Sequence, residues 1–155
     1  MIKFSLLRQH PDNTQPKRYK FNSWLKFGLV SEYANVFLTI NLVNQETSRE
    51  LNFSYRGIDK STNVISLEYP ETLKKYNMLT GEIILCDEVI VNEAKSQGKL
   101  FLDHYAHIFI HGLLHLQGFD HLEEVGAQKM EDLEIKILQK LGIQNPYLKM
   151  QINEK

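Results

Sequence analysis

Five of the six histidines in this chain lie between positions 104 and 121. His104, His107, His111 and His115 follow one another at steps of three, four and four, which places their imidazoles on one face of a helix. Imidazole nitrogen is a common ligand of zinc and other transition metals. The spacing therefore indicates metal chemistry on a helix face.

A third histidine can join the last pair. His111 and His115 lie one helical turn apart and can aim their ring nitrogens at one point. Gly118 can end the helix in a left-handed conformation and turn the chain back, which would bring His121 to the same point. Three histidines leave a fourth position open for water, as in a catalytic zinc site. We therefore predict one zinc ion per chain held by His111, His115 and His121, although nickel or copper would accept the same ligands.

The two earlier histidines of this helix have less certain roles. His107 and His104 lie one and two turns before His111. They could orient a ligand, contact substrate or pack in the core. We favour a supporting role, either orienting a ligand or packing.

The spacing H-x-x-x-H-x-x-G-x-x-H equals that of the metzincin metalloproteases, with one chemical part missing. Those enzymes carry a glutamate after the first histidine as general base, and here that position is Gly112. The sequence thus predicts a metal hydrolase other than a conventional protease. Two alternatives stay open: a metalloprotease of unusual mechanism, and a binding module with structural zinc. Structural zinc normally has four protein ligands, which disfavours the second.

The remaining sequence must form the elements that position these histidines. A glycine follows two of the predicted helices, at Gly57 and Gly98, and Asp87 is predicted to cap another. Strands dominate the first half and helices the second, so we expect a compact α+β or α/β domain. The patterns predict helices over 19–33, 46–55, 88–97, 100–117 and 121–141, strands over 36–43, 64–67 and 83–86, and a short apolar run over 2–7.

Composition limits the classes of partner. The chain has 155 residues, a formal charge of -1 and 43% hydrophobic residues, as expected for one globular domain spanning 1–155. This charge balance gives no broad electrostatic attraction to nucleic acid or membranes. Cys86 is the single cysteine, which excludes an internal disulfide. No apolar stretch approaches about 18 residues, and residues 1–11 do not resemble a signal peptide, so we expect a cytoplasmic protein without a membrane partner.

Two blocks of sequence resemble one family. Residues 111–121, His-Gly-Leu-Leu-His-Leu-Gln-Gly-Phe-Asp-His, resemble the H-G-x-L-H-L-x-G-x-D-H signature of the YbeY family of bacterial rRNA maturation factors. Residues 51–59 and 62–66 resemble that family's L-N-x-x-Y-R-G-x-D and T-[DN]-V-[LI]-S stretches. Gly81-Glu82-Ile83 stands where the family usually has Gly-Asp-Ile, and Asn145-Pro146-Tyr147-Leu148 resembles a common C-terminal ending of the family. The resemblance is dense from Leu51 to Leu148.

The resemblance implies a zinc-dependent, single-strand-specific endoribonuclease that acts in rRNA maturation at the 16S 3′ end and in ribosome quality control. It also implies an α+β fold, a small mixed sheet packed with several helices. Carried over by residue, His111, His115 and His121 are the metal ligands, and Arg56 is the catalytic or substrate-binding arginine. The expected partners are single-stranded RNA and the small ribosomal subunit or its assembly factors, with no DNA. A guanidinium suits phosphate because its donors form a planar fork.

Overall fold

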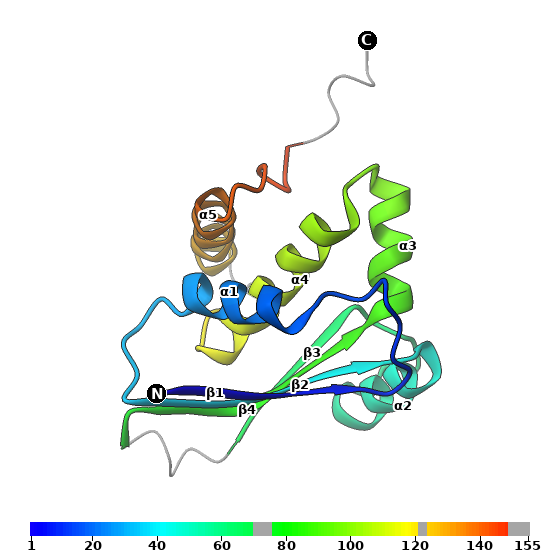
Figure 1. Cartoon of the computed structure of the whole chain (residues 1–155), viewed down its shortest axis with the longest axis horizontal. Coiled ribbons are helices and arrows are strands. Elements are labelled where there is room, and N and C mark those ends of the chain that lie inside the picture. The colour runs from blue at the N-terminus through cyan, green and yellow to red at the C-terminus, as the bar shows by residue number, and fades with distance from the viewer. Residues whose placement is uncertain (70–75, 121–123, 149–155) are drawn as a thin grey trace.

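A computed structural model describes residues 1–69, 76–120 and 124–148 (Figure 1). Helices and strands are interspersed along the first hundred residues, and helices follow. In chain order they are β1 (Ile2–Arg8), α1 (Arg18–Gly28), β2 (Asn35–Val43), α2 (Gln45–Arg56), β3 (Val64–Glu68), β4 (Met78–Cys86), α3 (Asp87–Gln97), α4 (Phe101–Leu116) and α5 (Glu124–Lys140).

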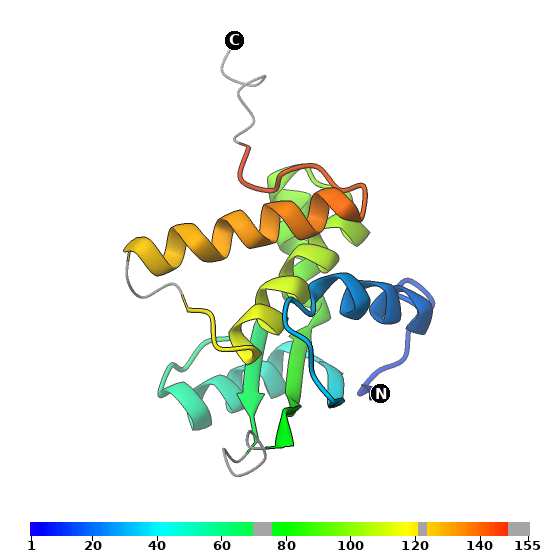
Figure 2. The same cartoon turned by 90° about the vertical axis from the view of Figure 1, so that its left-hand side faces the viewer.

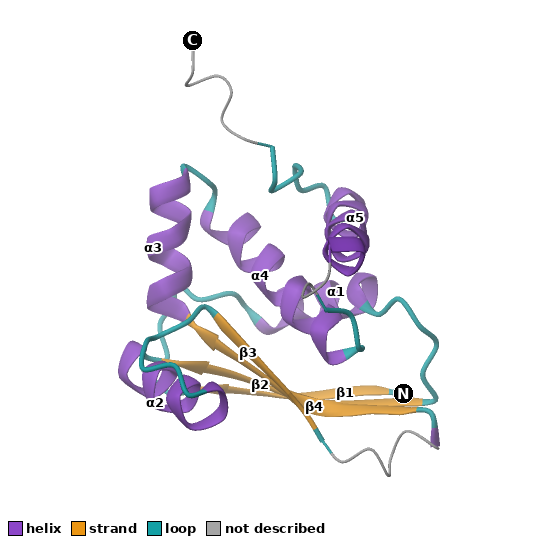
Figure 3. Cartoon of the chain, turned by 180° about the vertical axis from the view of Figure 1, so that it is seen from behind, coloured by secondary structure: helices purple, strands orange, loops and turns teal. Residues whose placement is uncertain are grey.

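The strands form one mixed sheet in the order β1-β2-β4-β3. Strand β2 pairs in parallel with both β1 and β4, whereas β3 is antiparallel to β4 and forms an edge. Helices α1, α3, α4 and α5 lie on one side of this sheet, and α2 lies on the other (Figure 3). The predicted α+β fold with a small mixed sheet is thus confirmed.

Helix α4 is the centre of the hydrophobic core. Eleven of its sixteen residues are buried, because the sheet covers one side of α4 and helices α1, α3 and α5 pack against its other sides. Figure 2 shows α5 running across α4. Phe21 of α1 packs edge-on against Tyr105 and Phe109 of α4, with ring centroids 6.3 and 5.4 Å apart. The helix with the histidines is therefore fixed on several sides.

Most predicted elements are confirmed, and three details differ. The first helix ends at Gly28 rather than at residue 33. Strand β4 begins at Met78, five residues before the prediction, because its early residues pair with β2 from Asn35 onward. Asp87 does not cap α3. It is the first helical residue, and its carboxylate accepts a hydrogen bond from the Tyr105 hydroxyl at 3.0 Å. Within the described ranges, no helix has the length and apolarity that a membrane span needs.

Candidate metal and active site

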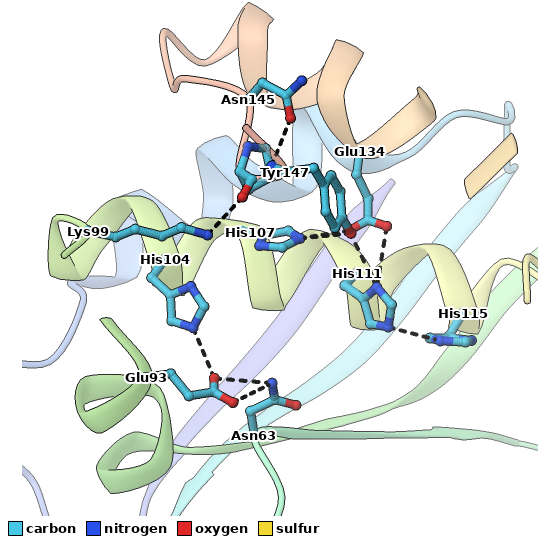
Figure 4. Close-up of polar contacts among 11 residues, drawn as sticks. Asn63, Glu93, Lys99, His104, His107, His111, His115, Glu134, Asn145 and Tyr147 are labelled. Carbon is cyan, nitrogen blue, oxygen red and sulfur yellow. Dashed lines mark hydrogen bonds and ion pairs between the residues drawn. The ribbon is translucent and has the colours of Figure 1, made fainter. Parts of the chain in front are cut away.

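His111 and His115 face each other near the end of α4. Their Nε2 atoms are 3.1 Å apart, and the rings meet edge-on with centroids 4.6 Å apart (Figure 4). Both residues are half-buried, so the pair opens toward the surface. The helix ends just beyond them, and Gly118 has a φ of 96°, as the predicted left-handed turn requires.

The distance between the two Nε2 atoms fits zinc. Two nitrogens about 2.0–2.1 Å from a tetrahedral zinc ion lie about 3.3–3.4 Å apart, close to the separation found here. The third predicted ligand, His121, lies outside the described residues. Among the residues that are described, no group of three or more His, Cys, Asp or Glu side chains forms a candidate metal site. The three-histidine zinc site, metzincin-like in its spacing, therefore remains a prediction, of which two ligands are brought together.

A buried glutamate on α5 contacts the other nitrogen of His111. Glu134 is 1% exposed, and its Oε2 and Oε1 lie 3.3 and 3.4 Å from His111 Nδ1. Its Oε1 also accepts hydrogen bonds from His107 Nε2 at 2.8 Å and from the Tyr147 hydroxyl at 2.7 Å. Burial alone would raise the pKa of Glu134, but the hydrogen bonds from His107 and His111 lower it to about 2. Glu134 is therefore an ionised carboxylate that only accepts hydrogen bonds.

His107 is consequently a neutral support for Glu134. Burial lowers the pKa of His107, which keeps its imidazole uncharged near neutral pH. Its single N–H must be at Nε2, since Glu134 can only accept. Its Nδ1 is buried with no hydrogen-bond partner among the described residues.

His104 forms a separate pair with Glu93 of α3. His104 Nε2 lies 2.9 Å from Glu93 Oε1, and the amide of Asn63 donates to both carboxylate oxygens at 3.2 and 3.3 Å. Burial opposes ionisation of Glu93, but hydrogen bonds from His104 and Asn63 lower its pKa. This pair ties α4 to α3 and to the segment before β3. The supporting role expected of His104 and His107 agrees with these contacts.

Gly112 is explained by packing. A Cβ at this position would lie 2.8 Å from Val64 Cγ2 and 3.1 Å from Ser66 Oγ. The Ser66 hydroxyl donates to the Gly112 carbonyl at 2.7 Å, which holds α4 against β3. A glutamate, as in the metzincins, would bring its Cβ against Val64, so that Val64 or the helix would have to shift.

Arg56 reaches the strand that packs beside Gly112. It is the last residue of α2, its side chain is exposed, and its Nη2 donates to the Val64 carbonyl at a long 3.5 Å. The loop after Arg56 is held by other residues: Arg49 forms two bonds to Asp59, at 2.6 and 3.0 Å, and Asn52 donates to the Lys60 carbonyl at 2.8 Å. Arg56 is therefore placed beside the start of β3, and its role in substrate binding remains a prediction.

Sequence reasoning missed Glu134, which contacts His111, and Tyr147, which donates to Glu134. Glu134 shares a helix face with three buried residues, Met130, Ile137 and Leu138. A carboxylate within such an apolar stripe is a signal of a buried, partnered charge. Tyr147 belongs to the C-terminal family pattern, but nothing in the pattern indicates which residue its hydroxyl contacts.

Comparison with known proteins agrees with the sequence resemblance. The family model described as endoribonuclease YbeY matches residues 9–142. An endoribonuclease YbeY from Colwellia psychrerythraea is 46% identical over 139 residues, which cover 86% of this chain and 88% of that protein. An endoribonuclease YbeY from Cupriavidus necator is 43% identical over 132 residues, 85% of this chain, and the chain spans 64% of that protein's length.

A solved structure shares the fold. The solution structure of a Thermotoga maritima protein superposes with a TM-score of 0.56 at 25% sequence identity, and the match covers 90% of this chain and 89% of that one. The family match, the two curated relatives and this structure cover most of the chain. Together with the paired histidines of α4, they show that the chain belongs to the endoribonuclease YbeY family.

Proposed function

We propose that this protein is a zinc-dependent endoribonuclease that cleaves single-stranded RNA, with one zinc ion held by His111, His115 and His121. The observation that carries the proposal is the 3.1 Å approach of the two Nε2 atoms on α4, in a chain of the endoribonuclease YbeY family. Two imidazole nitrogens aimed at one point can supply half of a tetrahedral ligand set. The histidine-rich helix thereby supplies the centre of the proposed site.

The chain's own groups divide the work. Zinc, when bound, can polarise a phosphoryl oxygen and make water acidic enough to serve as a nucleophile or base near neutral pH. His111 and His115 provide nitrogen lone pairs, and Glu134 holds the opposite side of the His111 ring. Arg56 would bind the scissile phosphate through its planar guanidinium and stabilise the negative charge that grows during attack. No glutamate next to His111 is needed for this chemistry.

The biological substrate follows from the family resemblance. We propose that the enzyme acts in the cytoplasm on ribosomal RNA, at the 3′ end of 16S RNA, and in ribosome quality control. The small ribosomal subunit or its assembly factors would be its partners. Gly112 disfavours a protease of the metzincin kind, because glycine supplies no general base and a longer side chain there would meet Val64.

One experiment separates this proposal from its alternatives. Purified protein is analysed for metal and then incubated with single-stranded RNA, duplex RNA and an unfolded protein, each with and without a chelator. We expect about one zinc ion per chain and metal-dependent cleavage of single-stranded RNA only. Cleavage of the unfolded protein would favour the metalloprotease. Zinc binding without any cleavage, with unfolding after chelation, would favour the other alternative, a ribosome- or protein-binding module in which zinc is structural.

A further inference from the structure

Residues 141–148, the C-terminal segment that follows α5, reach Glu134, the carboxylate beside the proposed metal ligand His111. Lys99 donates to the carbonyl of Pro146 at 3.0 Å, and the Tyr147 backbone N–H donates to the Asn145 side chain at 2.8 Å. These bonds place the Tyr147 ring against His107, with centroids 5.3 Å apart and an interplanar angle of 83°. The Tyr147 hydroxyl then reaches Glu134 at 2.7 Å (Figure 4).

The hydrogen bonds around Glu134 leave one oxygen for His111. Oε1 has two short partners, the Tyr147 hydroxyl and His107 Nε2. Oε2 lies 3.3 Å from His111 Nδ1 and has no shorter partner among the described residues. Both contacts of this carboxylate with His111 are made at Nδ1, so an N–H at Nδ1 would donate to Oε2. The Nε2 of His111 would then present a lone pair toward His115.

We propose that Glu134 is the positioning residue of His111, and that Tyr147 and His107 hold Glu134 in place, so that the C-terminal segment is part of the support of the metal site. This inference rests on the proposed function in one respect, that His111 is a metal ligand. Glu134 acts through His111 and touches neither metal nor substrate. Its effect is to select the Nδ1–H form of the ring and to fix the ring's direction.

Glu134 is held in place by hydrogen bonds from two directions. The carboxylate is almost completely buried and receives donors from α4 and from the C-terminal segment. A buried charge with several partners has few alternative positions, because each lost bond leaves a group unsatisfied. His107 and Tyr147 bind Oε1 and thereby fix the orientation of the whole carboxylate, including the Oε2 that faces His111. Removing either one loosens the support without removing it.

The first test measures zinc affinity by competition with a chelating dye. Glu134→Gln keeps the shape of the side chain but loses the charge, and we expect the zinc dissociation constant to rise by about 10–100-fold. Tyr147→Phe removes one hydrogen bond to Glu134 and should raise it by about fivefold. Two control variants remove comparable groups elsewhere: Asp132→Asn, an exposed carboxylate on α5, and Tyr19→Phe, an exposed tyrosine. Neither control should change the affinity.

The second test needs neither zinc nor activity. Nitrogen-15 NMR of the metal-free wild type reports which nitrogen of His111 carries the proton, and we expect Nδ1. Glu134→Gln should weaken that preference. A wild-type His111 protonated on Nε2 would overturn the inference, and this measurement stands even if Glu134→Gln does not fold.

The outcomes also separate this inference from the proposed function. If His111→Ala retains full zinc content, His111 is not a ligand and the proposed function loses its assignment. If His111→Ala loses zinc while folded Glu134→Gln and Tyr147→Phe bind zinc like the wild type, only the positioning role fails. Cobalt substitution gives a further readout, because a reoriented ligand changes the visible spectrum of Co²⁺ whereas a purely structural role would not.

Discussion

Two of the histidine–carboxylate pairs of helix α4, those of His104 and His111, use opposite nitrogens. Near the start of α4, His104 contacts Glu93 through Nε2, and the Nδ1 of His104 is buried without a partner among the described residues. Near the end of α4, His111 contacts Glu134 through Nδ1, and the Nε2 of His111 lies 3.1 Å from the Nε2 of His115. The His104 side chain is 3% exposed and that of His111 is 26% exposed.

The difference shows why only one of these residues suits a metal. A ligand needs an accessible nitrogen lone pair, and a carboxylate on the other nitrogen improves it by fixing the ring and its proton. His104 has its outward nitrogen already bonded and its second nitrogen enclosed. In His111 the carboxylate contacts Nδ1, and the Nε2 that faces His115 belongs to a half-buried ring. The same chemical pairing therefore ties helices together at one end of α4 and, under the proposed function, would orient a metal ligand at the other.

The largest effect is expected from exchanging the two histidines for alanine in turn. His111→Ala should lower the metal content from about one zinc per chain to near zero, because it removes a ligand. His104→Ala should keep the zinc and lower the melting temperature, because it breaks a buried tie to Glu93. Metal analysis and thermal unfolding are measured on the same preparations. Loss of zinc in folded His104→Ala, or full zinc in His111→Ala, would contradict the comparison.

The next effect concerns Arg56, the last residue of α2. Arg56→Ala should reduce RNA cleavage by about 10²–10³-fold while zinc content and melting temperature stay near wild type. Arg56→Lys should restore only part of the rate, since the charge remains but the planar fork is lost. Lys136→Ala, which removes an exposed cation from α5, is the control and should cleave normally. If Arg56→Ala unfolds, or cleaves like wild type, Arg56 has no place in the active site.

A smaller effect is expected where α4 passes β3. Gly112→Ala should lower the free energy of unfolding by about 1–3 kcal/mol, because the added methyl overlaps Val64 and approaches Ser66. Truncating the neighbour in the double variant Gly112→Ala, Val64→Ala should recover part of this loss. Denaturant unfolding of the two single variants and the double variant gives the coupling. Additive losses would show that the methyl is accommodated elsewhere. Gly112→Glu should be more disruptive and should not create peptide hydrolysis.

The smallest effect is the pH dependence of the Glu93 pair. Because the pKa of Glu93 is lowered in the folded protein, this carboxylate contributes stability above its unfolded pKa of about 4.3. That contribution is lost as the pH falls through the lower, folded pKa. The melting temperature of Glu93→Gln should thus be below wild type at neutral pH and should fall less steeply below about pH 4.3. Parallel curves for the two proteins would refute this origin.

Local patterns predicted much of the fold. The helix expected over 100–117 is observed as Phe101–Leu116, since its apolar residues recur with the helical period and bury against the sheet and neighbouring helices. Gly57 and Gly98 end their helices in left-handed conformations, as expected. The early part of β4 was missed because Met78, Leu79 and Thr80 become a strand through pairing with β2. Such pairing is a property of distant segments, which single-sequence periodicity does not contain.

The sequence by itself determined that His111 and His115 share a helix face, because helical spacing is a local property of the chain. It also determined that a glycine turn follows them. Only the tertiary structure decided which nitrogen of each histidine is occupied. That choice depends on α5 bringing Glu134 to His111 and His107, on the C-terminal segment bringing Tyr147 to Glu134, and on α3 bringing Glu93 to His104. These partners come from elements separated in sequence, and the packing of apolar faces, rather than residue spacing, brings them together.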